Sequence, residues 1–359
     1  MDNTVTVDDL LKMDKPYLVD VRSPGEFQAG HICGAINVPL FSDEERSQVG
    51  ILYKTDGGEA AKTLGLSLVG PKLSSMVETV QALHKTGRPV VVYCWRGGMR
   101  SLSIVNVLRM MGVAALQLLG GYKAHRRYVL EALQNFVVRP RIVMLCGSTG
   151  TGKTTLLKLL EKREIPVLDL EQLANHRGSA FGQVGLGQGT TAQNFDAQLL
   201  VALQHLDQYP YFVVECESKR IGNVYLPDTL YQAMKTGEKI LLSADREVRV
   251  DRLIEEYGVP TEPQQAMILE CIRSLRKRLG QNKTEQLSQS LQQGNIREVV
   301  RTLLQDYYDP LYGYETADPT SFHCALTADS LDEAVLAIVQ YLETGGRNCG
   351  ANGRRNLTK

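Results

Sequence analysis

The chain has 359 residues, 43% of them hydrophobic and 22% charged, and its formal net charge at pH 7 is zero. This length exceeds one ordinary hydrophobic core and fits two domains, while no apolar run approaches a membrane span and the first residues form no export signal. Seven scattered cysteines without a Cys-x-x-Cys pair fit a reducing compartment, so we expect a cytoplasmic protein with no membrane partner.

Apolar runs typical of buried strands alternate with segments of helical spacing along the first part of the chain. Glycine and proline punctuate these segments. Strands are predicted at residues 16–21, 89–93 and 114–119, helices at 73–85 and 101–111, and mixed helical sequence at 42–70.

A second cycle of alternation follows. Strands are predicted at residues 142–146, 166–170, 211–216 and 239–243, and helices at 153–162, 192–206 and 248–257. From about residue 263 helical, Gln-rich and charged sequence dominates. Such alternation predicts α/β architecture, with parallel sheets covered on both faces. We expect domains at residues 1–133 and 134–345, and a disordered tail at 346–359.

The first chemical site follows the strand at residues 89–93. Cys94 ends this strand, and Gly97 and Gly98 let the backbone curl before a helix begins. Successive N–H groups then converge with the positive helix end, which stabilises a thiolate and binds an anion beside it. Arg100 can add a forked positive charge to that anion. The pattern predicts a nucleophilic cysteine; the alternative is a buried structural cysteine before an ordinary turn.

The second site is a complete G-x-x-x-x-G-K-[ST] motif at residues 147–154. It follows an apolar strand and opens a helix, the context in which backbone N–H groups wrap a diphosphate. The lysine neutralises phosphate charge, and the last threonine can ligate magnesium. The predicted phosphate-binding residues are Gly147, Gly150, Gly152, Lys153 and Thr154.

The acidic partner of this loop is open among three strand-end carboxylates, those of Asp169, Glu215 and Glu217. Glu215 is the preferred metal or base position, although a strand-end carboxylate is often a structural cap. If magnesium is used, Thr154 and Glu215 would hold it. The motif recognises a diphosphate whatever is attached, so it does not by itself indicate nucleotide hydrolysis.

Residues 20–27 (DVRSPGEF), 30–32 (GHI) and 34–39 (GAINVP) resemble the opening of a rhodanese domain, and the resemblance covers roughly residues 5–130. It implies that Cys94 carries sulfur or selenium. One feature departs from the family: five residues separate Cys94 from Arg100, where many rhodaneses have four. The wider loop also matches cysteine phosphatases, so a phosphatase or a phosphate-bearing donor remains open.

Both motifs on one chain resemble the bacterial tRNA 2-selenouridine synthase family, as do the segments 53–66, 176–182, 215–222 and 308–312. The resemblance implies a rhodanese-like domain followed by a P-loop NTPase-like domain with a helical C-terminal part. It implies a transferase that converts wobble 2-thiouridine of tRNA into 2-selenouridine through S-geranyl-2-thiouridine. Geranyl diphosphate and selenophosphate would be co-substrates, with no tightly bound cofactor, magnesium optional and Cys94 carrying selenium. Further substrate-site residues would be His176, Arg177, Ser179 and Glu215.

Two basic clusters are candidates for the RNA surface, since local patches rather than net charge attract phosphate. One interleaves bases with aromatic residues at 122–128, where a tyrosine can stack on a base, and the other has helical spacing at 273–278. Ordinary solvated helix faces are the alternative for both. The candidate residues are Lys123, Arg126, Arg127, Arg273 and Arg276.

Two other functions remain compatible with the motifs. One is a cysteine phosphatase or sulfurtransferase domain fused to an ATP-dependent P-loop kinase. The other is a non-catalytic, nucleotide-gated binding protein. The intact cysteine, glycine pair and arginine argue against the second.

Overall fold

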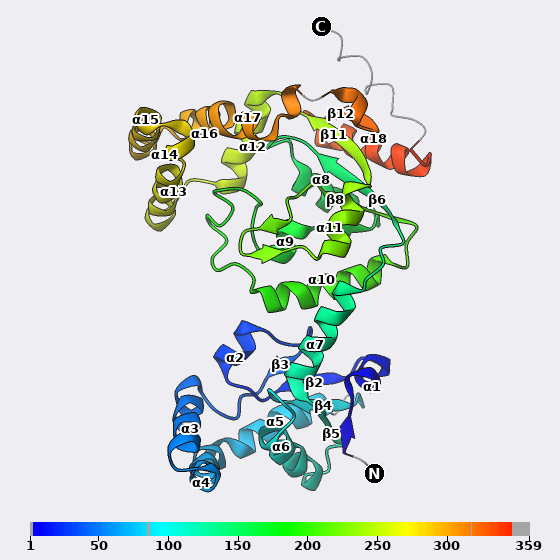
Figure 1. The fold of residues 1–359 in the computed structure, drawn as a ribbon, viewed down its shortest axis with the longest axis vertical. Coiled ribbons are helices and arrows are strands. Elements are labelled where there is room, and N and C mark those ends of the chain that lie inside the picture. Colours follow the sequence, from blue (N-terminus) through cyan, green and yellow to red (C-terminus); the bar gives the residue numbers. More distant parts are fainter. Residues whose placement is uncertain (1–2, 85–86, 317, 347–359) are drawn as a thin grey trace. The chain divides into compact units, whose positions relative to one another are not determined.

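The computed structural model describes residues 3–84, 87–316 and 318–346 (Figure 1). The chain divides into two compact units, one of residues 1–135 with 191–200 and one of residues 136–190 with 201–359. The predicted disordered tail lies, apart from Gly346, outside the described residues. Within the described residues no helix is long and apolar enough to cross a membrane.

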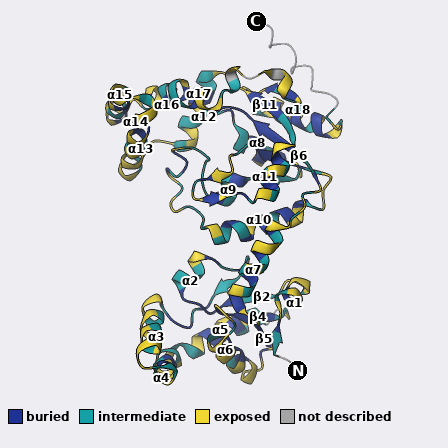
Figure 2. Ribbon diagram, in the orientation of Figure 1, coloured by how far each residue is buried: buried dark blue, intermediate teal, exposed yellow. Residues whose placement is uncertain are grey.

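The first unit contains a five-stranded parallel sheet in the order β1-β5-β4-β2-β3. Alternate residues of the central strand β4 enter two different hydrophobic clusters, Val90 and Val92 one, Val91 and Tyr93 the other. All four are fully buried (Figure 2), as expected for a parallel strand covered on both faces. The strands are β1 (Thr4–Val5), β2 (Tyr17–Asp20), β3 (Ile36–Asn37), β4 (Val90–Tyr93) and β5 (Ala115–Leu118).

The helices predicted in this unit are confirmed, with ends that differ by one or two residues. The mixed segment 42–70 forms a pair of helices that turn at Gly57, whose φ of +88° suits glycine. Its first helix starts with a capping box between Ser42 and Glu45. The helices are α1 (Val7–Lys12), α2 (Pro24–Ala29), α3 (Asp43–Thr55), α4 (Gly58–Val69), α5 (Leu73–His84), α6 (Met99–Met110) and α7 (Gly121–Gln134).

The second unit contains another five-stranded parallel sheet, in the order β12-β11-β6-β8-β7, which confirms the α/β prediction. The strand predicted at 166–170 is shorter, because the Asp169 side chain accepts the Gln172 N–H and starts a helix. Strand β12, in sequence expected to be helical, was not predicted. The strands are β6 (Arg141–Cys146), β7 (Val167–Leu168), β8 (Tyr211–Glu215), β9 (Arg220–Ile221), β10 (Val224–Tyr225), β11 (Glu238–Ser243) and β12 (Cys324–Thr327).

The helical C-terminal part is confirmed, and α13 to α16 gather on the opposite side of the second unit from α18 (Figure 1). They share a hydrophobic cluster with α12, separate from the cluster around the sheet. The helices are α8 (Lys153–Glu161), α9 (Leu170–Ala174), α10 (Ala192–Leu206), α11 (Asp228–Lys235), α12 (Arg246–Tyr257), α13 (Glu262–Ser274), α14 (Arg276–Leu279), α15 (Gln281–Gln292), α16 (Ile296–Leu303), α17 (Asp309–Tyr312) and α18 (Leu331–Glu343), with a π-helical turn at Leu304–Tyr308.

A buried ion pair fixes the end of β2 in the first unit. The Arg22 guanidinium donates to both carboxylate oxygens of Asp20, and its Nη2 also donates to the Gly30 carbonyl at 2.6 Å. It also lies 4.1 Å from the centroid of the Tyr122 ring. Both side chains are removed from solvent. The buried charge of Arg22 is therefore compensated by its ion pair with Asp20 and its hydrogen bond to Gly30.

Replacing Asp20 by leucine should lower the free energy of unfolding of this unit by about 3–5 kcal/mol, because Arg22 would stay buried without its carboxylate. The double variant Asp20→Leu/Arg22→Met should recover part of this loss. Trp95 is the only tryptophan, so its fluorescence during urea denaturation reports on this unit. An equal loss of unfolding free energy in the single and double variants would show that the unpaired Arg22 charge is not the cause.

Candidate functional site

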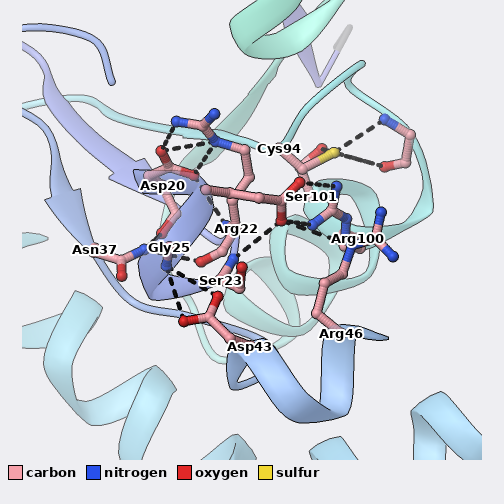
Figure 3. A network of polar contacts seen from close by, with 12 residues as sticks. Asp20, Arg22, Ser23, Gly25, Asn37, Asp43, Arg46, Cys94, Arg100 and Ser101 are labelled. Carbon is pink, nitrogen blue, oxygen red and sulfur yellow. Dashed lines mark hydrogen bonds and ion pairs between the residues drawn. The ribbon is translucent and has the colours of Figure 1, made fainter. Parts of the chain in front are cut away.

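The first candidate site is the loop that follows β4 (Figure 3). The Cys94 side chain is buried, and its Sγ accepts the Gly98 N–H at 3.3 Å and lies 3.2 Å from the Ser101 hydroxyl. Gln117, from β5, holds the loop by donating to the Gly97 and Gly98 carbonyls and to Ser101. One backbone N–H therefore reaches the sulfur, and the Ser101 hydroxyl lies within hydrogen-bond distance of it, with either atom able to donate.

The two predicted glycines have different roles. Gly97 has a φ of +61°, and a Cβ there would lie 2.5 Å from the Leu118 carbonyl oxygen. A Cβ at Gly98 would meet nothing within 4 Å, so its contribution is the N–H that reaches Cys94. Gly121, which sequence reasoning missed, is the tightest, because a Cβ there would lie 2.2 Å from the Cys94 carbonyl oxygen.

Arg100 contacts a carboxylate that the sequence did not single out. Its Nη1 lies 2.7 Å from Glu26 Oε2 and its Nη2 lies 3.3 Å from Oε1 (Figure 3). Burial opposes ionisation of Glu26, but the hydrogen bonds and charge of Arg100, with the nearby Arg46, lower its pKa overall. The charge of Arg100 is therefore shared with Glu26, whereas the sequence predicted that it serves only an anion beside Cys94.

A groove of about 1150 Å³ opens beside Cys94 and lies wholly within the first unit. Arg96, which is exposed, is part of its lining. The segment 53–66, noted in the sequence only as a point of family resemblance, supplies part of its wall through α3 and α4. The polar lining includes Arg96 and the ion-paired group of Glu26, Arg46 and Arg100. The apolar lining includes Leu40, Phe41, Ile51, Leu66, Val69 and Val107.

The second candidate site is the phosphate loop between β6 and α8, whose predicted strand–loop–helix context is present. Gly150 and Gly152 have φ of +82° and +92°, and a Cβ at Gly147 would lie 2.6 Å from the Leu242 carbonyl oxygen. All three glycines are thus required by the backbone path. The Lys153 ammonium donates to the Gly147 carbonyl at 2.8 Å and lies over the loop.

Two arginines of α12 anchor this loop from outside. Arg249 Nε donates to the Thr149 carbonyl at 2.9 Å, and its guanidinium forms a buried ion pair with Asp309. Arg252 donates to the Thr151 carbonyl at 3.1 Å. These contacts occupy loop carbonyls and fix the path of the loop.

Beside the loop, the carboxylate that contacts Thr154 is not the one that the sequence favoured. Glu171 Oε2 accepts from the Thr154 hydroxyl at 3.1 Å, whereas Glu215 is buried and accepts the Glu171 N–H at 2.8 Å. Glu215 is thus the structural cap left open in the sequence, and Glu171 replaces it beside Thr154. Within the part of the chain that is described, no cluster of three or more His, Cys, Asp or Glu forms a metal site. A magnesium ion brought with a diphosphate would be held by Thr154 and Glu171.

Burial raises the pKa of Glu171 to about 8, and the charge of Glu217 adds to this effect. Burial also raises the pKa of Glu215 and Glu217. Gly178 makes the close approach of these groups possible, because a Cβ there would lie 2.6 Å from Glu171 and 2.7 Å from Glu217. Glu171 escaped prediction because it stands within a short helix rather than at a strand end.

The predicted substrate residues at 176–182 are placed close to this carboxylate group, but their contacts differ. His176 Nδ1 accepts the Gly178 N–H at 3.1 Å, and burial lowers the pKa of the imidazole. Arg177 binds Glu256 at 2.8 Å and donates to the Val184 carbonyl at 2.7 Å. It therefore fastens the loop to α12. Ser179 lines an apolar cavity.

The basic candidates for RNA binding are divided by their contacts. Arg126 is paired with Asp196 at 2.6 Å, and Tyr122 and His125 are buried, so neither ring can stack on a base. Arg127 lies 3.9 Å from Glu131, and Arg276 donates to Gln281. Exposed positions that remain for phosphate contact are Lys123, Arg127, Arg273 and Arg276.

Comparison with known proteins gives a separate family match for each of the two regions that hold a candidate site. Residues 140–343 match the family described as "tRNA 2-selenouridine synthase AAA domain", and residues 5–127 match "Rhodanese-like domain". The chain is 36% identical over 343 residues to a tRNA 2-selenouridine synthase of Pseudomonas syringae pv. syringae, covering 88% of this chain and 92% of that protein. It is 35% identical over 341 residues to a protein of the same name from Alcanivorax borkumensis, covering 87% and 92%. A crystal structure of the N-terminal domain of a putative ATP/GTP binding protein from Clostridium difficile 630 is 44% identical over 35% of this chain and 98% of that chain, with a TM-score of 0.34.

The titration of Glu171 should make diphosphate binding depend on pH. Below about pH 8 its carboxyl is mainly protonated, and above it the added negative charge repels a bound phosphate. We expect the affinity for inorganic diphosphate without magnesium, in the presence of a chelator, to fall by roughly tenfold between about pH 7 and pH 9, measured by calorimetry. Glu171→Gln should remove this fall while retaining the ligand's own titration. An unchanged pH dependence in the variant would contradict the assignment.

Proposed function

Because the chain belongs to the tRNA 2-selenouridine synthase family, an enzyme family of tRNA modification, we propose that it replaces sulfur by selenium in wobble 2-thiouridine through an S-geranyl intermediate. The observation that carries this proposal is the pairing, on one chain, of a buried thiol at Cys94 that accepts the Gly98 N–H with a complete phosphate loop. A single-step transferase would need only one of these sites. The substrates are tRNA, geranyl diphosphate and selenophosphate from a separate supply.

In the first step the sulfur of 2-thiouridine attacks C1 of geranyl diphosphate. The new C1–S bond forms as the C1–O bond breaks, the diphosphate leaves with the electron pair, and the N3 proton of the base is released. Lys153 and the loop N–H groups stabilise the charge that develops on the leaving diphosphate. A magnesium ion held by Thr154 and Glu171 would neutralise more of this charge.

The second step exchanges sulfur for selenium at C2 of the base. Alkylation turns a poor leaving group into a good one, since geranylthiol departs more readily than a thiocarbonyl sulfur. Cys94 releases the selenium of selenophosphate: its sulfur attacks phosphorus, the S–P bond forms as the Se–P bond breaks, and hydrogen selenide leaves. Hydrogen selenide then attacks C2 as the C2–S bond breaks and geranylthiol departs, and water hydrolyses the Cys94 phosphothioester to phosphate, so that no oxidant is needed. Arg46, Arg96 and Arg100 of the groove lining receive the phosphate of the donor. The large groove volume suits a modified nucleotide.

The role of Cys94 can be isolated by substitution. In Cys94→Ala, selenation should fall by at least about 10³-fold while geranylation continues, so S-geranyl-2-thiouridine accumulates. Nucleoside analysis of tRNA incubated with both co-substrates measures this. Cys33→Ala, which removes another free thiol of the same unit, is the control and should behave as wild type. Intact selenation in Cys94→Ala, or Cys94-dependent hydrolysis of an aryl phosphate without selenation, would refute the proposal in favour of another chemistry.

The phosphate loop should act in the other step. Lys153→Ala is expected to slow geranylation by at least about 10²-fold, because the charge on the leaving diphosphate loses its fixed cation. Selenation of tRNA that already carries S-geranyl-2-thiouridine should be unaffected. Lys158→Ala, on the exposed side of the same helix, serves as the matched control. Unimpaired geranyl transfer in Lys153→Ala would remove the phosphate loop from this step.

A further inference from the structure

An apolar cavity of about 90 Å³ adjoins the phosphate loop within the second unit. Thr149 of the loop lies at one side of it, and Ser179, Phe181 and Val184 come from the segment that follows α9. Helices α12, α13, α15 and α16 and the π-helical turn close the remaining sides. The aliphatic part of the lining includes Leu253, Ile268, Leu291, Val299, Val300 and Leu303.

The few polar side chains of this cavity are already engaged. The hydroxyls of Tyr257 and Tyr308 both interact with Ser179. A nucleoside base placed here would bury donors and acceptors without partners, which costs about 1–3 kcal/mol for each group. A hydrocarbon chain loses no hydrogen bond when it enters the cavity. Its burial is favourable by about 25 cal/mol of free energy for every Å² of apolar surface removed from water. The lining thus favours a hydrocarbon chain over a nucleoside.

A row of tyrosines leads from this cavity toward the carboxylates beside the phosphate loop. The Tyr308 and Tyr312 rings are stacked with centroids 6.4 Å apart, and those of Tyr312 and Tyr314 are 6.0 Å apart. Tyr312 interacts with Thr149 of the loop and feels the charge of Glu217. The faces of such rings attract positive charge, and positive charge develops on an allylic carbon as a diphosphate leaves it.

We infer that this cavity holds the terminal isoprene unit of the hydrocarbon chain of an allylic diphosphate, while the phosphate loop holds its diphosphate and the tyrosine row lies beside the reacting carbon. The inference rests on the proposed function for the presence of geranyl diphosphate at the loop. It adds the place of the chain and the residues that limit its length. It also separates this loop from those that bind ATP, because the neighbouring pocket recognises an alkyl chain.

Filling and enlarging the cavity tests the inference with the full-length protein. Val184→Phe should weaken binding of geranyl diphosphate by at least about tenfold and leave binding of inorganic diphosphate unchanged. Leu287→Phe is the matched control, because Leu287 is buried in the same hydrophobic cluster but does not line the cavity. Leu303→Ala should improve the use of farnesyl diphosphate relative to geranyl diphosphate, since the longer chain needs more room.

The outcomes distinguish this inference from the proposed function. If Lys153→Ala abolishes geranyl diphosphate binding but Val184→Phe and Leu303→Ala match wild type in affinity and chain preference, the inference is wrong and the proposed function stands. Equal losses for geranyl and inorganic diphosphate in Val184→Phe, or the same loss in Leu287→Phe, would also overturn it. If wild type binds ATP but not geranyl diphosphate, both fail.

Discussion

A tight glycine turn at the carboxyl end of a buried parallel strand is the constraint on which both candidate sites depend. At Cys94 the N–H of Gly98 points at the sulfur, and at residues 147–152 the turn of three glycines leads into α8. A turn this tight requires backbone at positive φ and no room for a Cβ. The strands themselves carry none of the proposed reactive side chains, but their burial determines the residue at which each turn begins.

The two loops differ in what surrounds them, and this difference supports the separate roles proposed for them. The loop at Cys94 opens on a wide groove with arginines in its lining, which suits a large nucleotide and an anionic donor. The phosphate loop is enclosed by carboxylates, tyrosines and a small apolar cavity, which suits a compact ester with a charged head and a hydrocarbon tail. Zero net charge is therefore compatible with two strongly polarised sites, because charge is separated locally.

Contiguous features could be predicted from the sequence, because one short segment determines them. The strands before Cys94 and before the phosphate loop, and the helices after them, are of this kind. Features that join distant segments could not be predicted. Glu26 meets Arg100 across 74 positions, and Glu171 reaches Thr154 from another helix. Strand β12 forms by pairing with β11, which is distant in the sequence, so no local pattern predicts it. The groove wall by α3 and α4 is likewise a result of packing.

Arg249 links two parts of the second unit in a way that sets their thermodynamic coupling. It donates to the Thr149 carbonyl and is ion-paired with Asp309, the first residue of α17, next to Tyr308. Because this pair is buried, separating it is costly, and the loop and the base of the aromatic row move as one body. A ligand that orders the loop therefore also stiffens the aromatic wall, and an alkyl chain seated against that wall pre-forms the loop. Head and tail of one molecule are then bound cooperatively, so each fragment alone binds more weakly than its share of the whole.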